Sequence, residues 1–445
     1  MKQHCLRFAL LSALAALVAP GLWACNESVV CPPRTVLQGD TCVPVHNPEA
    51  VCPSGGMLCA GRCVLVESDN AHCGNCNQAC AQNQHCADGE CLACNKESRL
   101  YAACMLTGHV AVFSSETYSR VALERVGANP QALSGKGEVL LCADDGAQQL
   151  LRLDAQTLQP LGAPVDTGQT PIHISAMGAL VYVVNAGSNT LQIVDTQNKP
   201  SGPWRTQGEL SFGPNTSPQA LAFVGSHGFV PLYGNLVTGQ TSPGQRLVRV
   251  GLANPAAPSL EGEVSFSGLH LQSHPGKTAL PLPYDVVHHQ GALYVALNNL
   301  DSTYQPAGPG AIAKVQLEEA TTSVLFLGEE CSNVTSLASN GQLLVASCAG
   351  DWGMTPGRAG LALIEGDEVK EVWPAPPSFS PGSMAFKCDS LWVANANGGN
   401  VYLFSTQEKS LQLLYGEGGS EGGPMEACPQ AASGFAVVQS LWLKP

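Results

Sequence analysis

The sequence predicts an all-β protein, a seven-bladed β-propeller that follows a small N-terminal disulfide-rich module. Three observations predict it: a strand pattern that repeats over the last 350 or so residues, ten cysteines between Cys31 and Cys91, and an apolar leader before Cys25. Of the 445 residues, 44% are hydrophobic and 13% are charged, which excludes a disordered chain. We expect a signal peptide over residues 1–24, the cysteine-rich module over 25–94 and the propeller over 95–445.

The leader has the pattern of an export signal. Lys2 and Arg7 precede an apolar stretch over residues 8–19, which is too short to span a bilayer but suits the core of a signal peptide. Residues 22–25 resemble a bacterial lipobox, which implies acylation of Cys25. The residue after it is not aspartate, which by the same resemblance implies an outer membrane lipoprotein. The alternative is ordinary cleavage before Cys25, which gives an extracellular protein with a further thiol for disulfide pairing.

The cysteine-rich stretch has too few large apolar residues to build a core of its own. In an exported protein, disulfides are the usual substitute for such a core. We therefore expect disulfides at Cys31, Cys42, Cys52, Cys59, Cys63, Cys73, Cys76, Cys80, Cys86 and Cys91. The alternative is a zinc ribbon, because two CxxC pairs, Cys73 with Cys76 and Cys91 with Cys94, are 14 residues apart. That alternative would leave Cys80 and Cys86 unused, and we expect no metal.

Part of this stretch resembles a known family. The runs 59–64 and 68–76, followed by Cys80, Cys86 and Cys91, are similar to the stigma-specific-protein-like cysteine-rich module, which recurs in secreted proteins of myxobacteria. The resemblance covers about 40 residues. It implies a small extracellular spacer or adhesion module, and it leaves the disulfide connectivity open.

The rest of the chain repeats a phrase in which a short apolar strand leads through a turn to a strand of aromatic and β-branched residues. The seven phrases start at Pro130, Pro171, Pro218, Pro283, Val334, Pro381 and Pro429. Consecutive prolines lie 41 to 65 residues apart, or 98 across the repeat that lacks one, which matches four-stranded propeller blades. Six blades lie complete between Gln131 and about Gly423. The seventh must combine strands from both ends of the chain, and the share from each end stays open.

Several strands also resemble a known propeller family. Tyr182-Val183-Val184-Asn185 and Trp392-Val393-Ala394-Asn395 resemble YVTN-type β-propellers over about residues 98–445. The resemblance implies the fold. Because the relatives include surface-layer proteins, lactonases and quinoprotein-like enzymes, it does not select a function.

Cysteines outside the module predict further cross-links. Cys388 with Cys428 could join the last complete blade to the closing one, and Cys104 and Cys142 are expected in neighbouring blades. Removal of the leader leaves 18 cysteines, and acylation of Cys25 leaves 17. An odd number predicts one free thiol.

Candidate binding residues come from long connections and from the inner strands. Long segments at 234–245, 253–282, 298–310 and 350–358 fall in connections that antiparallel blades place on one face. We expect that face to bind a ligand, and the alternative is that the segments are tolerated surface insertions. Their candidate residues are Tyr233, Asp301, Tyr304, Asp351, Trp352 and Arg358. The inner strands place His173, Asp285, Ser336 and Ser383 in one column with Ala132, Ala220 and Ala431. If it faces the channel, His173 and Asp285 form a polar site or a solvated lining.

The predicted function is binding rather than catalysis. A formal charge of −14 excludes a protein that neutralises phosphates of nucleic acid, and no sequence pattern supplies a convincing catalytic residue or cofactor. Gly418–Gly422 matches the letters of a nucleophile elbow but lacks the strand and helix that this motif needs. We expect an exported surface protein, held at the membrane through a lipid only, that contacts a protein or glycan. The alternatives are a lactonase-like or quinoprotein-dehydrogenase-like enzyme acting at the channel mouth, and a structural surface-layer component.

Overall fold

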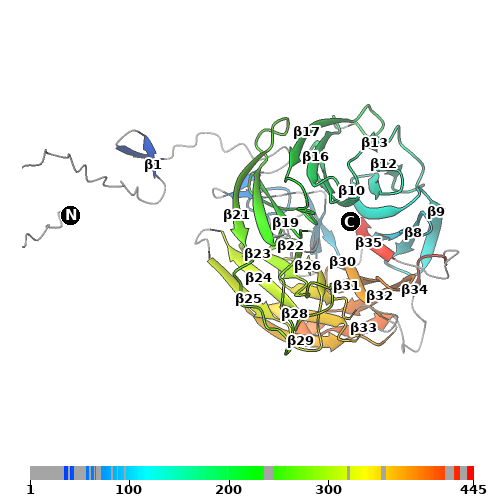
Figure 1. Cartoon of the computed structure of the whole chain (residues 1–445). Coiled ribbons are helices and arrows are strands. Elements are labelled where there is room, and N and C mark those ends of the chain that lie inside the picture. Colours follow the sequence, from blue (N-terminus) through cyan, green and yellow to red (C-terminus); the bar gives the residue numbers. More distant parts are fainter. Residues whose placement is uncertain are drawn as a thin grey trace, which may run out of the picture. The chain divides into compact units, whose positions relative to one another are not determined.

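A computed structural model gives the structure of the chain (Figure 1). It describes residues 35–38, 41–44, 57–59, 62–64, 66, 72–81, 84–87, 89–94, 97–197, 199–234, 244–317, 321–351, 357–377, 379–415, 425–430 and 438–444. Residues 1–49 and 50–445 form two compact units. In the first unit, β1 (Thr35–Gln38) pairs antiparallel with β2 (Thr41–Pro44). All other described elements belong to the second unit.

Seven antiparallel sheets form a ring in the second unit, so the chain is a seven-bladed β-propeller as predicted. The innermost strands are β10 (Pro130–Lys136), β14 (Pro171–Met177), β18 (Ala222–Val224), β22 (Pro283–His289), β26 (Val334–Ser339), β30 (Pro381–Lys387) and β35 (Val438–Lys444). The second strands are β11 (Val139–Asp144), β15 (Leu180–Asn185), β19 (His227–Leu232), β23 (Ala292–Leu297), β27 (Leu344–Cys348), β31 (Ser390–Asn395) and β7 (Arg99–Cys104).

Two further strands complete each blade. The third strands are β12 (Gln149–Asp154), β16 (Thr190–Asp195), β20 (Arg246–Gly251), β24 (Ala311–Gln316), β28 (Gly360–Glu365), β32 (Asn400–Ser405) and β8 (His109–Ser114). The outer strands are β13 (Val165–Asp166), β17 (Arg205–Ser211), β21 (Ser259–Ser265), β25 (Thr321–Phe326), β29 (Glu368–Pro374), β33 (Gln412–Tyr415) and β9 (Arg120–Arg125). The short strand β34 (Met425–Glu426) also pairs with β32, and a 3-10 turn, η1 (Gln407–Lys409), precedes β33.

The core lies between neighbouring blades. Second strands such as β11, β15 and β23 are buried at every residue, because each sheet has another sheet on both sides. Tyr182 and Val184 of one blade, for example, pack in one cluster with Val230 and Val248 of the next. The outer strands face solvent, and β21 is exposed at six of its seven residues. The apolar runs of the sequence are therefore mainly the second and third strands of each blade.

The closing blade takes one strand from the C-terminus and three from the N-terminus. The innermost strand β35 pairs with β7, and β8 and β9 follow outward. Figure 1 shows β35, in red, beside β8 and β9 in blue-green. A disulfide between Cys104 and Cys428 cross-links the two ends of the chain at this blade. The predicted bond between Cys388 and Cys428 is therefore wrong, because Cys388 bonds to Cys94.

The register of the inner strands shows that the sequence repeat misplaced the seventh inner strand. A bulge follows the first residue of the strand in β10, β14 and β35, so that Ala132, His173 and Ser440 begin the regular pairing. Val438 thus stands where five of the other six blades have proline. Ser440 is therefore the seventh member of the column that contains His173 and Asp285. Ala431, which the repeat pattern placed there, lies outside the described residues. Pro429 precedes β35 by nine positions, so the letters of the repeat misplaced the strand.

The cysteine-rich segment, whose described residues fall within 57–94, consists of two hairpins cross-linked by disulfides. Strand β3 (Met57–Cys59) pairs with β4 (Arg62–Val64), and β5 (Gln84–Ala87) pairs with β6 (Glu90–Ala93). The internal disulfides join Cys59 to Cys76, Cys73 to Cys86, and Cys80 to Cys91. The predictions for Cys31, Cys42, Cys52 and Cys63 concern side chains outside the described part.

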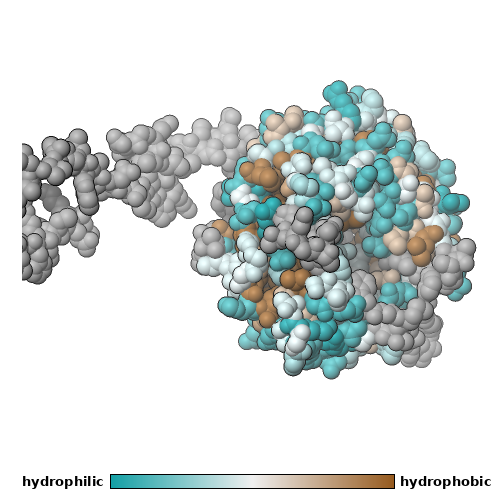
Figure 2. Space-filling view, in the orientation of Figure 1, coloured by the Kyte–Doolittle hydropathy of each residue, from teal (hydrophilic) through white to brown (hydrophobic). Residues whose placement is uncertain are grey.

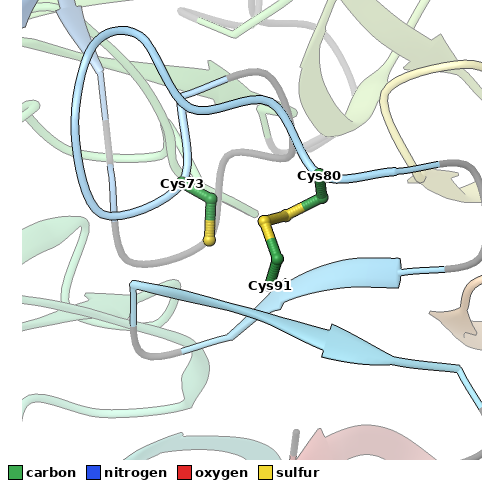
Figure 3. Close-up of side chains that lie close together, drawn as sticks. All are labelled: Cys73, Cys80 and Cys91. Atoms are coloured by element: carbon green, nitrogen blue, oxygen red, sulfur yellow. A yellow bond between two sulfur atoms is a disulfide. The ribbon is translucent and has the colours of Figure 1, made fainter.

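The sulfur atoms of Cys73, Cys80 and Cys91 lie within 4.8 Å of one another (Figure 3). This spacing could suggest a metal site. Each of the three sulfurs is in a disulfide, however, and Figure 3 shows the bond from Cys80 to Cys91. The four cysteines of the zinc-ribbon alternative, Cys73, Cys76, Cys91 and Cys94, are also all in disulfides. A disulfide sulfur carries no thiolate charge to bind zinc, so the structure contradicts that alternative.

Two other features of the described residues bear on the sequence predictions. Cys142 on β11 is a free thiol that is fully buried, and burial raises its pKa, so it stays protonated and unreactive. Among the described residues, no helix is long and apolar enough to cross a membrane.

Candidate functional site

A cavity of about 1730 Å³ follows the axis of the ring. Its walls are the seven inner strands, and the two residues after the first position of each repeat form two rings around it. The upper ring consists of Gln131, Ile172, Gln219, Tyr284, Thr335, Gly382 and Gln439. The next ring consists of Ala132, His173, Ala220, Asp285, Ser336, Ser383 and Ser440. The cavity wall is thus built mainly from amides, hydroxyls and small apolar groups.

Polar residues of the second ring join neighbouring blades. The Asp285 carboxylate accepts a hydrogen bond from the Leu337 amide of the next blade at 2.8 Å. The Ser383 hydroxyl accepts one from the Leu441 amide at 3.2 Å. The Ser440 hydroxyl likewise accepts from Leu133 across the closing blade at 3.1 Å. Because these bonds satisfy backbone donors at the crowded axis, the polar column has a structural task besides lining the cavity.

His173 and Asp285 both line the cavity, on the second and fourth blades, and each is perturbed by burial. Burial lowers the pKa of His173 to about 4, so its ring is neutral near pH 7. Burial raises the pKa of Asp285 to about 6, although hydrogen bonds from the Leu337 and Val286 amides oppose the rise. The His173 ring bonds to the Ser175 hydroxyl at 2.9 Å, and each of the two predicted channel residues has its own partners.

The raised pKa of Asp285 predicts a pH dependence of stability. The folded protein holds this proton more tightly than the unfolded chain, whose aspartate has a pKa near 3.8. The contribution to stability is therefore complete below about pH 4 and is lost as pH rises through about 6. We expect the unfolding free energy of the unmodified protein, relative to Asp285→Asn, to fall by on the order of 2 kcal/mol between pH 4 and 7. Parallel curves for the two proteins in denaturant titrations would contradict this account.

The long connections gather on one face, which we call the insertion face: residues 233–234, 266–282, 298–310, 349–351 and 357–359. The backbone N–H of His274 donates to the Ala307 carbonyl at 2.6 Å, and Leu280 forms a β-bridge with Leu300. A side chain at Gly308 would meet the Gln272 carbonyl oxygen at 2.2 Å. This glycine therefore permits the close approach of the two connections.

One expected segment needs correction. The stretch 253–282 contains the outer strand β21 and a turn of the opposite face, so only its part after β21 belongs to the insertion face.

Most charged residues of this face pair with one another. Asp351 accepts hydrogen bonds from Arg358, the shorter at 2.5 Å, and Arg358 also donates to the His274 ring nitrogen Nε2 at 2.6 Å. The Glu329 carboxylate lies 3.7 Å from the same nitrogen. The salt bridge from Lys277 to Asp301, at 3.2 Å, joins the connection 266–282 to the connection 298–310.

Asp301 shapes its own loop. Its carboxylate accepts from the Thr303 hydroxyl at 2.5 Å and from the Gln305 amide at 3.1 Å. These bonds, with the first the largest cause, lower the pKa of Asp301 to about 2. The predicted charged residues Asp301, Asp351 and Arg358 are thus engaged in holding the connections in place.

Three tyrosines lie near one another, and one of them, Tyr284, lines the channel. The rings of Tyr233 and Tyr284 make an edge-to-face contact with centroids 5.9 Å apart. Burial, together with the nearby hydroxyls of Tyr284 and Tyr304, raises the pKa of Tyr233. Tyr304 is 38% exposed, and Tyr284 belongs to the upper ring of the cavity. We call Tyr233, Tyr284 and Tyr304 the tyrosine cluster.

The structure brings together most of the residues that the sequence proposed for binding. Tyr233 and Tyr304 lie in the tyrosine cluster, Asp351 lines the cavity, and Asp301 and Arg358 hold the connections beside it. Trp352 lies outside the described residues. Sequence reasoning missed Tyr284, although it follows Pro283 directly. The one signal for it was its place in the repeat, where three other blades carry glutamine.

The surface turned toward the viewer in Figure 2 is mostly hydrophilic. Its hydrophobic residues form separate small patches among the coloured atoms. Large exposed hydrophobic residues of the described chain, such as Val121 and Leu260, are on outer strands far apart in the ring order. This pattern does not resemble the continuous apolar patch of an obligate protein interface.

Comparison with known proteins supports the fold. The sequence matches no family model and no curated protein. Among solved structures, it is similar to a putative 6-phosphogluconolactonase from Bacteroides uniformis, with a TM-score of 0.54 and 14% identity over 78% of this chain and 99% of that one. It is also similar to the periplasmic gluconolactonase PpgL of Pseudomonas aeruginosa, with a TM-score of 0.52 and 14% identity over 77% and 100% of the two chains. At such identity, these similarities support the propeller fold alone.

Proposed function

We propose that the protein is an exported, non-enzymatic binding protein that takes an uncharged saccharide at the tyrosine cluster. The observation that carries the proposal is a group of three tyrosines beside a cavity lined by amides and hydroxyls: Tyr284 lines the cavity, Tyr233 contacts its ring, and Tyr304 lies near Tyr233. Tyrosine offers a flat apolar ring and a hydroxyl at low cost in side-chain entropy. These groups can contact both the C–H face and the hydroxyls of a sugar ring.

The charges around the cavity support an uncharged ligand. The acidic side chains in the described lining are Asp285, Asp351 and Asp389. Asp351 is paired with Arg358, and Asp285 is hydrogen-bonded to backbone amides. Carboxylates disfavour an anionic ligand, and charges that are already paired offer little attraction to a charged protein partner. A glycan therefore fits better than a charged protein surface.

Lactone hydrolysis is the rival proposal, because two of the similar structures are named as gluconolactonases or putative 6-phosphogluconolactonases. A phosphorylated sugar would need cations at the cavity wall, whereas the acidic residues Asp285, Asp351 and Asp389 line it here. The binding proposal expects no hydrolysis of gluconolactone or 6-phosphogluconolactone above the buffer rate. Turnover that Asp285→Asn abolishes would favour the enzyme instead.

Binding can be tested with a panel of uncharged gluco-, manno- and galacto-oligosaccharides of three to seven units. We expect Tyr304→Ala to weaken binding of the best oligosaccharide at least tenfold, because an aromatic residue at the centre of a binding site contributes roughly 1–3 kcal/mol. Titration calorimetry measures the loss. The matched control is Leu260→Ala, which removes a side chain that is 51% exposed on the outer strand β21. Equal affinities for the two variants would count against the tyrosine cluster.

The cysteine count supports export as a lipoprotein. A chain that starts at Cys25 has 18 cysteines. The six described disulfides use twelve, and Cys142 is a buried thiol. The other five are Cys25, Cys31, Cys42, Cys52 and Cys63. Acylation of Cys25 leaves an even number of thiols for pairing, as an oxidising compartment favours.

Lipidation predicts the mass of the mature N-terminus. We expect mass spectrometry of the membrane-extracted protein to find a diacylglyceryl group on Cys25 and one fewer unpaired thiol than a secreted form with an unmodified Cys25 would have. An unmodified N-terminal Cys25 in the culture medium would contradict the lipid anchor.

The finer family assignments are also proposals. The YVTN-like strand ends at Asn185 and Asn395 and the stigma-like cysteine run at 59–76 support membership in those families. A surface-layer role would instead predict that the purified protein assembles with itself.

A further inference from the structure

The cavity extends beyond the propeller to the cysteine-rich segment. The residues of this segment that line it include Val64, His72, Ala79, Ala81 and Gln84. They share the cavity with the turns that follow the inner strands, which lie at the end of the channel opposite the insertion face. Strand β4 of the segment also lies against the inner strand β18. The cysteine-rich segment and the propeller, which the sequence predicted to be separate domains, therefore border one cavity.

A covalent bond holds the cysteine-rich segment at this end. Cys94, the last residue of the described segment, is bonded to Cys388 in the turn between β30 and β31. The next residue of that turn, Asp389, lines the cavity.

The chain just after Cys94 is also fixed to the propeller. The Ser98 amide donates to the Ser115 hydroxyl oxygen at 2.8 Å, and the buried Lys387 amine donates to the same oxygen at 2.7 Å. The segment is thus attached at its C-terminal end, and its three internal disulfides limit how far the remainder can move.

We propose that the cysteine-rich segment is a wall of the ligand cavity rather than a free spacer, and that the Cys94–Cys388 disulfide holds it over the lower end of the channel. Resting on the proposed function, the inference is that an oligosaccharide enters from the insertion face and ends against this wall. A cavity of about 1730 Å³ exceeds the usual range for one small molecule, roughly 300–1,000 Å³. It therefore suits a chain of several sugar units rather than a single one.

The role of the cysteine-rich segment as a cavity wall can be tested by placing bulky side chains on it. Ala79 and Ala81 are small, exposed and part of the cavity lining. Asn77 is also exposed on the same segment but is not part of that lining. A tryptophan at position 79 or 81 would occupy space that the ligand needs, whereas one at position 77 would point to other surroundings. The two kinds of variant are matched in size and in distance from the disulfides.

The first experiment compares Ala79→Trp, Ala81→Trp and Asn77→Trp with the unmodified full chain, using the uncharged oligosaccharides of three to seven units. We expect the two alanine variants to lose at least tenfold in affinity for the longest oligosaccharide and less for the shortest, with Asn77→Trp unchanged. Unchanged affinity of both alanine variants, beside normal binding by the parent, would overturn the inference and leave the proposed function standing. Failure of the parent to bind any member of the panel would instead overturn the proposed function.

A second measurement tests the attachment without any ligand. Proteolysis of the unreduced protein followed by mass spectrometry should release one cross-linked peptide pair that contains Cys94 and Cys388, and reduction should separate it. A pair that joins Cys94 to another cysteine of the segment would leave the segment untethered and would overturn the inference. Thermal unfolding midpoints of the tryptophan variants within a few degrees of the parent confirm that lost binding is not lost folding.

Discussion

Replacing Cys104, Cys428, Cys94 and Cys388 together with serine should prevent stable folding. The bonds Cys104–Cys428 and Cys94–Cys388 span 324 and 294 residues. Cys94 and Cys104 lie about 10 positions apart along the chain, and Cys388 and Cys428 about 40. When one bond is present, the other therefore closes an additional loop of only about 50 residues. Loss of either bond should therefore cost roughly 4 kcal/mol, and loss of both roughly 10 kcal/mol. The second figure is comparable to the whole stability of a typical domain.

Guanidinium titrations of the two double-serine variants and the quadruple variant measure these losses. The control is Cys331→Ser with Cys348→Ser, which opens a loop of 17 residues and should cost roughly 3 kcal/mol. The informative result is that the two long-range losses exceed additivity, since either bond already restricts the chain that the other closes. Strictly additive losses would contradict the idea that both bonds close the same ring.

Trp392→Ala should be the most damaging single core substitution. Trp392 is fully buried on β31, between the last complete blade and the closing one, in a cluster with Leu100 and Phe113. Its ring also contacts Tyr118, with centroids 5.9 Å apart. Truncation to alanine should lower the free energy of unfolding by about 3–5 kcal/mol, because a cavity would open where the two ends of the chain meet.

The matched control is Trp392→Phe. The indole N–H of Trp392 is buried and has no hydrogen-bond partner among the described residues. Phenylalanine keeps an aromatic ring in the core and removes this unpaired donor, so the loss should be only about 1 kcal/mol. Denaturant unfolding of both variants measures the difference. Equal losses would mean that the site depends on the N–H rather than on packing against the closing blade.

The sequence predicted the blades because their cause is local. Apolar second strands and a turn after each inner strand recur with the spacing of one sheet, as Tyr182–Asn185 and Trp392–Asn395 illustrate. The error at Pro429 has a local cause too. Pro429, Gln430 and Ala431 repeat the letters of Pro130, Gln131 and Ala132, whereas only pairing with β7 shows that Val438 begins the strand.

The candidate site was less accessible to sequence reasoning because it depends on contacts between distant residues. The connections that carry Tyr233 and Tyr304 could be assigned to one face from strand order alone. Their meeting with Tyr284 depends on how neighbouring blades pack around the axis. Likewise, 19 cysteines allow many pairings, and nothing near Cys94 in the sequence indicates a partner 294 residues away. The placement of the cysteine-rich segment at the channel therefore required the structure.

A crystal structure of the protein soaked with the best-binding uncharged oligosaccharide tests the central claim most directly. The account predicts density for a sugar ring against Tyr233, Tyr284 and Tyr304, with further units extending down the cavity toward Ala79 and Ala81. Density on an outer strand, or between the hairpins of the cysteine-rich segment with the cavity empty of sugar, would contradict it.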